Sequence, residues 1–337
     1  MEKATTKQVS EKVEKRATEK EVKEASEVFN NMKAEIGKAF FGQEPVVNAL
    51  VRSLICDGHV LLEGVPGIAK TLVIKALAEV SGCSSKRIQF TVDLLPTDIL
   101  GLTTYTPQKG FEIEKGPIFA NFIIADEINR SPPKTQSALI EAMQEKQVTI
   151  GKQTFKLPIP FFVMANQNPL ENEGVYTLPE AQVDRFLFKI IFSYPSYEDE
   201  SKIMENNTTF KKFDDIKLKA ITNPSKIVAL QELVHRVYMD EKIKKYITDI
   251  VTKTRTKDFD LGKYIELGAS PRASIGIYIA AKAEALMNGR NYVIPNDIKV
   301  VTPDVLRHRL ILSFRSRAEG VDADKVIAEV LRIIPVP

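Results

Sequence analysis

The chain of 337 residues lacks tryptophan and has only two cysteines. Cys56 and Cys83 do not have the spacing of metal ligands, which excludes a zinc ribbon and favours a reducing compartment. No apolar run is long enough to span a bilayer, and the segment Glu2–Glu27, which alternates Lys and Glu, does not resemble a secretory signal. We therefore expect a cytoplasmic protein without membrane insertion.

The chain also lacks a strong excess of charge of either sign. Its 47 Lys and Arg residues against 44 Asp and Glu residues leave a net charge of +3, which is small for a protein that tracks a phosphate backbone. We therefore do not expect nucleic acid to be a partner. The three histidines, at positions 59, 235 and 308, are scattered and have no acidic or thiol partners at metal-binding spacing, so we interpret them as packing or surface residues.

The segment His59–Thr71 is the most informative part of the chain. An apolar run is followed by the turn Gly64-Val65-Pro66-Gly67-Ile68-Ala69-Lys70-Thr71, and then by a helical pattern. In this strand–loop–helix order the loop amides and the helix N-terminus form a phosphate site. We expect Lys70 to reach the β- and γ-phosphates of ATP and Thr71 to bind Mg²⁺. Ala69 replaces the consensus glycine, and its small side chain fits the first turn of a helix.

A second motif is the apolar run Phe122–Ala125, which ends in two carboxylates, Asp126 and Glu127. The carboxyl ends of parallel strands form the edge where ligands bind in an open α/β sheet. This pattern predicts that Asp126 holds Mg²⁺, directly or through water, and that Glu127 orients and deprotonates the attacking water.

Four other polar residues are candidates for the same reaction. Asn168 follows the next apolar run and could hold the lytic water, and Asn166, two residues earlier, is its rival. Arg185 precedes a later apolar run, and Arg272 opens a helical pattern. Planar guanidinium groups suit the charge that develops on γ-phosphoryl oxygens, so both arginines are candidate catalytic residues.

The order of patterns predicts an α/β domain over residues 34–195 with a five-stranded parallel sheet covered on both faces. Helices are expected at Glu44–Cys56 and Lys134–Gln144, with Ser131 as N-cap of the latter, and Leu94–Gly101 is expected to be irregular. The first expected strand is the apolar run before the glycine-rich turn. Four further strands are expected at Ile88–Val92, Phe122–Ala125, Phe161–Ala165 and Phe186–Phe192, and hairpins are expected at Thr103–Ile113 and Val148–Leu157.

From residue 196 to residue 337 the chain shows helical patterns and no strand-like run. The helices expected there are Ile227–Val237, Glu241–Thr254, Arg272–Met287 and Asp324–Ile333. We therefore predict a smaller all-helical domain after a boundary near Tyr194–Asp199. Residues 1–33 are expected to form a charged helical arm, solvated and held by i,i+4 ion pairs.

Together these motifs resemble the MoxR family of AAA+ ATPases. The motifs that carry the resemblance are FFGQ at Phe40, GVPGIAKT at Gly64, LPTDILG at Leu95, FIIADEINRSPPKTQSALIEAMQE at Phe122, ANQNPLENEGVYTLPEAQVDRF at Ala165, GASPRAS at Gly268 and TPDVLRHRL at Thr302. The likeness runs from about Ala34 to the C-terminus. One departure is Asn166, where members of the family have threonine.

The resemblance implies a role for each matched residue. Gly42 and Gln43 would contact ATP, Asn168 would be sensor 1, Arg272 would be sensor 2, and Arg185 would be the arginine finger for a neighbouring subunit. ATP in contact with Arg272 would then bridge the two domains. The segment Leu94–Lys115 would hold the helix-2 insert, and with the hairpin Val148–Leu157 it would project toward the centre of a ring, with six subunits the usual number.

Three functions remain open at this point. The resemblance implies a chaperone-like machine that remodels, matures or activates a partner complex, with a protein carrying a von Willebrand factor A domain as partner. The alternative is a DNA motor or a chelatase-like subunit, because helicases of the MCM class and magnesium chelatases share the helix-2 insert. A nucleotide-binding scaffold without hydrolysis is disfavoured by the presence of Glu127, Asn168 and Arg185.

Overall fold

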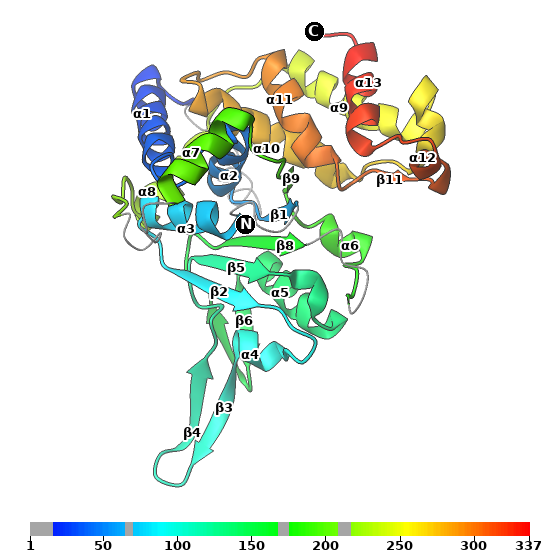
Figure 1. The fold of residues 1–337 in the computed structure, drawn as a ribbon. Coiled ribbons are helices and arrows are strands. Elements are labelled where there is room, and N and C mark those ends of the chain that lie inside the picture. The colour runs from blue at the N-terminus through cyan, green and yellow to red at the C-terminus, as the bar shows by residue number, and fades with distance from the viewer. Residues whose placement is uncertain (1–15, 65–69, 168–174, 208–216) are drawn as a thin grey trace, which may run out of the picture.

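The computed structural model describes residues 16–64, 70–167, 175–207 and 217–337. Its centre is a parallel sheet of five strands in the order β2-β5-β8-β1-β9 (Figure 1). The strands are β1 (Val60–Glu63), β2 (Ser85–Gln89), β5 (Phe122–Asp126), β8 (Phe162–Gln167) and β9 (Phe188–Ile191). The predicted five-stranded parallel sheet is therefore confirmed, with β2 starting three residues before the predicted strand.

Side chains of the central strands alternate between two separate apolar cores. Val60 and Leu62 of β1 are buried in one cluster, whereas Leu61 between them is buried in the other. This alternation follows from the two-residue repeat of a strand, and full burial on both sides explains why these strands are apolar throughout. The sheet must therefore be covered on both faces.

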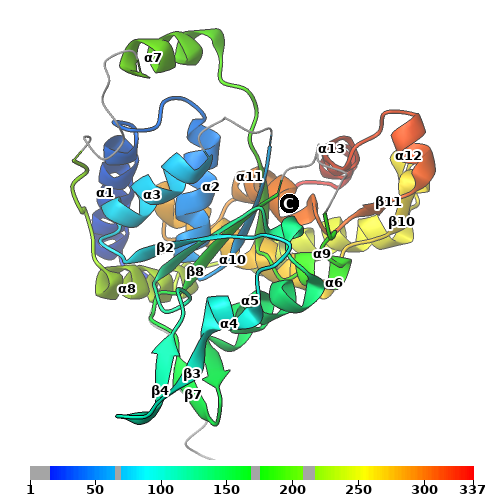
Figure 2. The same cartoon turned by 60° about the horizontal axis from the view of Figure 1, so that its bottom comes forward.

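Helices provide that cover. The helices α1 (Glu19–Ile36), α2 (Glu44–Ile55) and α3 (Lys70–Val80) contribute to the first core, and α4 (Pro96–Leu100) and α5 (Pro133–Glu145) contribute to the second. Figure 2 shows the two groups on opposite sides of the sheet. Two local predictions are wrong. The stretch expected to be irregular contains α4, and α5 is preceded by Pro132 without a side-chain cap, because the Ser131 hydroxyl donates to the Ile128 carbonyl instead.

Two hairpins extend from the second face. The first pairs β3 (Gly101–Thr106) with β4 (Gly110–Lys115), and the second pairs β6 (Gln147–Ile150) with β7 (Gln153–Lys156). Figure 1 shows the β3–β4 hairpin projecting far from the body of the protein. Near its tip the rings of Tyr105 and Phe111 are 5.1 Å apart, and both side chains are largely exposed. Both hairpins were expected from the sequence.

After α6 (Glu180–Val183) and α7 (Tyr197–Asn207), the chain enters a mainly helical region. Its helices are α8 (Pro224–His235), α9 (Glu241–Thr256), α10 (Pro271–Met287), α11 (Pro295–Leu306), α12 (Phe314–Ala318) and α13 (Ala323–Ile333). The region also contains an antiparallel pair, β10 (Ile265–Leu267) and β11 (Ile311–Leu312), which the sequence did not predict because neither strand exceeds three residues.

The N-terminal helix is not a solvated arm over the residues that the structure describes. In α1 the side chains of Val22, Ala25, Phe29, Met32 and Ile36 are buried in the first core. The side chain of Ser26 donates to the carbonyl of Met287 in α10. The expectation of a solvated helix is wrong for α1, because an apolar stripe at helical spacing lies between its charges.

The predicted boundary near residue 195 separates two regions that share one core. The first cluster continues from the sheet and α2 into α8, α9, α10 and α11. The buried guanidinium of Arg52 in α2 donates to the carboxylate of Glu284 in α10, with distances of 2.6 and 2.8 Å. The helical region thus packs tightly on the sheet region. Among the described residues no helix is both long and apolar enough to cross a bilayer.

Candidate active site

The first half of the site lies at the edge where the strands end. Lys70 opens α3 there, and its Nζ atom donates to the carbonyl of Gly64, 2.6 Å away. Burial lowers the pKa of Lys70, while the carboxylates of Asp126, Glu63 and Glu127 oppose that shift. The ammonium group therefore lies near three acids from the ends of two strands, β1 and β5. The loop residues Val65, Pro66, Gly67, Ile68 and Ala69 lie outside the described residues.

Asp126 is the last residue of β5, and partners on both sides hold its carboxylate. Arg87 of β2 donates from Nε to Oδ2 at 2.8 Å, and the side-chain amide of Asn166 in β8 donates to Oδ1. Asp126 itself is 7% exposed. Because β2 and β8 are the two neighbours of β5 in the sheet, the parallel topology places a partner on each side of Asp126.

Glu127 is the next residue and has a left-handed backbone, with φ 56° and ψ 49°. Such a conformation is uncommon for a side chain of this kind, and strained residues of this type gather at functional sites. Its amide donates to Oδ1 of Asn166 at 2.7 Å, which holds the turn in place. Its Oε2 atom accepts from Gln89 at 2.8 Å and pairs with Arg130 at 3.0 Å.

Asn166 therefore connects both acidic residues through one side chain. It donates to Asp126 and accepts from Glu127, and it is 5% exposed. Each end of its amide makes one hydrogen bond inside the protein, so in this structure Asn166 positions the two acids. Asn168, the other sensor candidate, lies outside the described residues. Its role stays a prediction.

The residues Gly42 and Gln43 stand just before α2 and both have positive φ values, 73° and 50°. The φ of Gly42 favours glycine, and a side chain at this position would also meet the side chain of Asp199 at 2.5 Å. The Oε1 atom of Gln43 is buried and has no hydrogen-bond partner among the described residues. An acceptor of this kind could take a hydrogen bond from a bound base, which fits the predicted contact with ATP.

The donor set at this edge fits a nucleotide with its metal ion. Thr71 and Asp126 supply the oxygen ligands that Mg²⁺ prefers, and Lys70 supplies a positive charge beside them. No cluster of three His, Cys, Asp or Glu side chains that could hold a metal ion is found among the described residues. ATP and Mg²⁺ therefore remain the cofactors that the residues favour.

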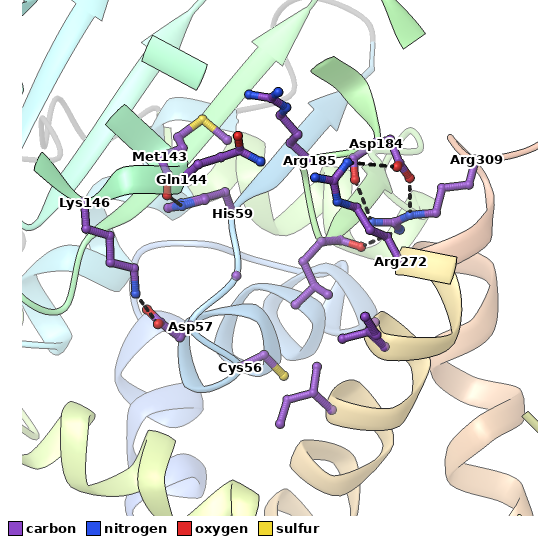
Figure 3. Close-up of a pocket in the computed structure, with 15 residues that line it drawn as sticks. Cys56, Asp57, His59, Met143, Gln144, Lys146, Asp184, Arg185, Arg272 and Arg309 are labelled. Atoms are coloured by element: carbon purple, nitrogen blue, oxygen red, sulfur yellow. Dashed lines mark hydrogen bonds and ion pairs between the residues drawn. The ribbon is translucent and has the colours of Figure 1, made fainter. Parts of the chain in front are cut away.

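The two predicted arginines lie at the other edge of the sheet. Phe188 pairs with Val60 at the first residue of β1, so Arg185 precedes β9 at the edge where the strands begin. Arg185 and Arg272 line one cavity of about 350 Å³ (Figure 3). The cavity is also lined by residues before β1 and at the end of α5, among them Asp57, His59, Met143 and Lys146.

The position of Arg272 corrects one expectation. The sequence led us to expect that Arg272 contacts the ATP of its own subunit and so bridges the two domains. In the structure its guanidinium instead pairs with Asp184 at 3.3 Å, at the edge opposite Lys70. The reason is that the lid packs beside β9 and α2. This packing places the start of α10, and Arg272 with it, near the amino ends of the strands.

The residues that line this cavity carry more positive than negative charge. Asp184 accepts from Arg309 at 2.9 Å and from the hydroxyl of Ser270 at 3.0 and 3.1 Å, in addition to its pair with Arg272. The Nε atom of Arg185 is buried and has no hydrogen-bond partner among the described residues. Burial lowers the pKa of Arg309 to about 10, so its guanidinium remains charged at neutral pH.

His59 is held by hydrogen bonds to the backbone, and neither cysteine is part of a disulfide. The Nδ1 atom of His59 accepts from the amide of Val163 at 3.0 Å, and Nε2 is 3.1 Å from the Met143 carbonyl, which fixes the tautomer with the proton on Nε2. Burial lowers the pKa of His59 to about 4, so the ring is neutral at pH 7. Cys56 and Cys83 are both free thiols.

The sequence did not reveal several of these partners. Arg87 and Gln89 are alternate residues of β2, and nothing in their local pattern distinguishes them from solvent-facing strand positions. Arg309 belongs to the motif TPDVLRHRL, which was noted without a role. One signal was available in the sequence: two arginines and a histidine directly follow an apolar helical pattern. Residues of these types are mostly exposed in proteins, whereas here they are largely buried.

Comparisons with known proteins agree with this geometry. Residues 59–188 match the ATPase family associated with various cellular activities (AAA), and residues 261–330 match the AAA lid domain. The chain is 46% identical over 308 residues to the Chaperone MoxR1 of Mycobacterium tuberculosis, covering 90% of this chain and 81% of that protein. It is 43% identical over 303 residues to the YeaC protein of Bacillus subtilis, covering 90% and 92%.

A solved structure has the same fold. It is a candidate ATPase from Cytophaga hutchinsonii, which superposes with a TM-score of 0.86 at 43% sequence identity and covers 94% of this chain and 98% of that one. A relative at 46% identity over nine-tenths of the chain, together with the AAA core and lid matches, decides the family. The chain belongs to the MoxR family of AAA ATPases.

Proposed function

We propose that this protein hydrolyses Mg-ATP at a site that two copies of the chain complete together. The observation that carries the proposal is the separation of the catalytic groups. Lys70, Asp126 and Glu127 gather at one edge of the sheet, while Arg185 and Arg272 lie at the other. A head-to-tail contact would bring the arginines of one subunit to the phosphates of the next, and repetition of that contact closes a ring, with six the usual number.

Within one subunit, each residue at the carboxyl edge has a definite task. Lys70 binds the phosphates, and Thr71 and Asp126 would hold Mg²⁺, which neutralises phosphate charge when bound. Glu127 orients the attacking water and takes its proton. Oε2 of Glu127 accepts from Gln89 and pairs with Arg130, so these two partners orient the carboxylate that would take the proton.

We further propose that ATP turnover drives chaperone-like remodelling, maturation or activation of a partner complex in a reducing, cytoplasmic compartment. Two points support this: the name of the Mycobacterium tuberculosis relative, Chaperone MoxR1, and the projecting β3–β4 hairpin with Tyr105 and Phe111 exposed near its tip. The resemblance stated above makes a protein with a von Willebrand factor A domain the partner that we propose. A net charge of +3 does not favour the DNA motor.

Mixing two inactive variants tests the shared site. Arg185→Ala is expected to bind ATP nearly normally and to hydrolyse it far more slowly, because a finger supplied in trans is worth about 10³–10⁵ in rate. Lys70→Ala is expected to lose nucleotide binding. In mixed rings the intact P-loop of one variant meets the intact Arg185 of the other, so part of the activity should return. If mixed rings form and no activity returns, Arg185 does not act across the interface.

A further inference from the structure

The motif after α11 has a specific set of contacts in the structure. Arg307, His308 and Arg309 follow the last residue of that helix, and each bonds to the carbonyl of a residue between positions 184 and 189. Arg307 donates to the Lys189 carbonyl at 2.6 Å, and Nε2 of His308 is 3.0 Å from the Phe186 carbonyl. The segment held in this way contains Arg185 and leads into β9, the edge strand of the sheet.

Arg309 is the centre of this contact. Its side chain is 3% exposed, and its Nε donates to the Asp184 carboxylate at 2.9 Å. Its Nη atoms donate to three carbonyls on both sides of Arg185: those of Asp184 at 3.1 Å, Phe186 at 2.7 Å and Leu187 at 3.0 Å. A planar guanidinium with five donors is the only side chain that can make such a set of bonds at once.

The side chain of Arg185, unlike that of Arg309, is not held by hydrogen bonds at its Nε atom among the described residues. Its backbone is held from the lid on both sides, whereas its buried Nε has no partner among the described residues. Arg272, which opens α10 of the same lid, shares Asp184 with Arg309. Asp184, Arg272 and Arg309 therefore form one unit beside Arg185, and Figure 3 shows the dashed contacts that join Asp184 to Arg272 and Arg309.

We propose that Arg309 is the positioning residue of the Arg185 finger and joins that finger to the lid of its own subunit. The inference rests on the shared ATP site proposed above. A buried arginine that fixes the backbone around position 185 holds the finger at one location and makes it move only with the lid. The nucleotide of the neighbouring subunit would then act on the lid of this subunit through Arg185 and Arg272.

The substitution Arg309→Lys tests this assignment. Lysine keeps the charge beside Asp184, but its three donors on a single nitrogen cannot bond the Asp184 carboxylate and three separate carbonyls at the same time. A displacement of about 1 Å in a catalytic group can cost on the order of 10²-fold in rate. We expect kcat to fall by at least about 10-fold, while KM and the affinity of the variant's own site for a fluorescent ATP analogue change by no more than about twofold.

Two mixtures separate positioning from general damage to the fold. Mixed with Lys70→Ala, the Arg309→Lys subunit offers its intact P-loop to an intact finger, so activity should return. Mixed with Arg185→Ala, every finger in the ring is defective, and activity should stay low. The matched control is Arg290→Lys, which breaks a partly buried bidentate pair with Asp297 elsewhere in the lid and should leave kcat unchanged.

The outcomes separate two proposals: the positioning role of Arg309 and the ATP site shared between subunits. Wild-type kcat in assembled Arg309→Lys rings, or a slow variant that Lys70→Ala does not rescue in mixed rings, overturns the positioning role alone. Wild-type kcat in Arg185→Ala overturns the shared site and this inference with it. If Arg309→Lys does not assemble, Arg309→Gln replaces it, because glutamine has only two side-chain donors and cannot keep all three carbonyl bonds. The same loss of kcat with rescue by Lys70→Ala is then expected, and its absence contradicts the proposal.

Discussion

The side-chain amide of Asn166 donates a hydrogen bond to the carboxylate of Asp126. Its carbonyl oxygen accepts from the amide of Glu127 at 2.7 Å, so one buried side chain fixes both the acid proposed to hold Mg²⁺ and the proposed base that follows it. Because Glu127 has a left-handed backbone, the bond to its amide also stabilises a conformation that its own side chain disfavours.

Asn166→Ala should therefore lower kcat more than it lowers ATP affinity. It leaves the amide of Glu127 without a partner and frees one oxygen of Asp126, and a buried group left unsatisfied costs about 1–3 kcal/mol. Asn166→Thr, which introduces the residue of other family members, should retain more activity, because a hydroxyl can both donate and accept. Steady-state ATPase assays on both variants make the comparison. Equal activity of Asn166→Ala and the wild type would refute the positioning role of Asn166.

Lys70→Ala and Glu127→Gln should fail at different steps. Without the Lys70 ammonium beside the carbonyl of Gly64, the phosphates lose their cation and nucleotide binding should be lost. Glu127→Gln keeps a hydrogen-bonding side chain of the same size and cannot accept a proton, so ATP should bind and not turn over. Equilibrium binding and phosphate release separate the two. Hydrolysis by Glu127→Gln at the wild-type rate contradicts the assignment of the base.

Glu127→Gln also offers a way to the partner. A ring that holds ATP without hydrolysis should stay bound to the protein on which it acts, so pull-down with this variant in ATP should enrich that protein over pull-down with Lys70→Ala. The proposal names a protein with a von Willebrand factor A domain as the enriched species. Equal recovery with both variants, or enrichment of DNA, would argue against ATP-dependent remodelling of such a partner.

The parts of the site that depend on adjacent residues could be predicted from the sequence. The order of strand, loop and helix around Lys70, and the apolar run that ends in Asp126, each place a side chain at the carboxyl edge of a parallel sheet without knowledge of the rest of the chain. The hairpin at Gly151-Lys152 is equally local, and the structure confirms it with a φ of 61° at Gly151.

The partners from distant segments could not be predicted in this way. Arg272 meets Asp184 across 88 positions, and Arg309 meets it across 125. These contacts depend on how the lid packs on α2 and β9, which no local periodicity contains. For α1 a signal was present in the spacing of Phe29, Met32 and Ile36, but the Lys and Glu residues around them led to the prediction of a solvated helix.

The packed position of α1 leads to a prediction on stability. Phe29 is fully buried against the shared core, so Phe29→Ala should destabilise the protein by about 3–5 kcal/mol. Lys23→Ala on the exposed face of the same helix is the control and should change the free energy of unfolding by less than about 0.5 kcal/mol. Chemical denaturation measures both. A loss below about 1 kcal/mol for Phe29→Ala would mean that α1 behaves as an independent arm.

Arg272→Ala distinguishes the two possible sites for this arginine. If Arg272 acts on the neighbouring subunit, as its contact with Asp184 suggests, the variant should keep the ATP affinity of its own site and lose kcat. Mixed rings with Lys70→Ala should regain activity, as for Arg185→Ala. If instead Arg272 binds the ATP of its own subunit, affinity should fall in the variant and the mixture should not recover.

His59 makes the stability of the protein sensitive to acid. Its pKa falls from an ordinary value of 6.5 to about 4 in the folded state, chiefly because burial disfavours the charged ring. Between these two values the unfolded chain binds a proton that the folded chain does not. The contribution of His59 to stability is therefore complete above pH 6.5 and is lost as the pH falls toward 4, by on the order of 3 kcal/mol in total.

The substitution His59→Gln tests this dependence. Glutamine can still accept from the Val163 amide and donate to the Met143 carbonyl, and it has no titration in this range. The drop in the free energy of unfolding between pH 7 and pH 5 should be smaller in His59→Gln than in the wild type. It should not vanish, because burial also lowers the pKa of His308 well below its ordinary value. The control is His235→Gln, at an exposed position, which should follow the wild-type curve. If His59→Gln follows the wild-type curve as well, the acid sensitivity does not come from the ring of His59.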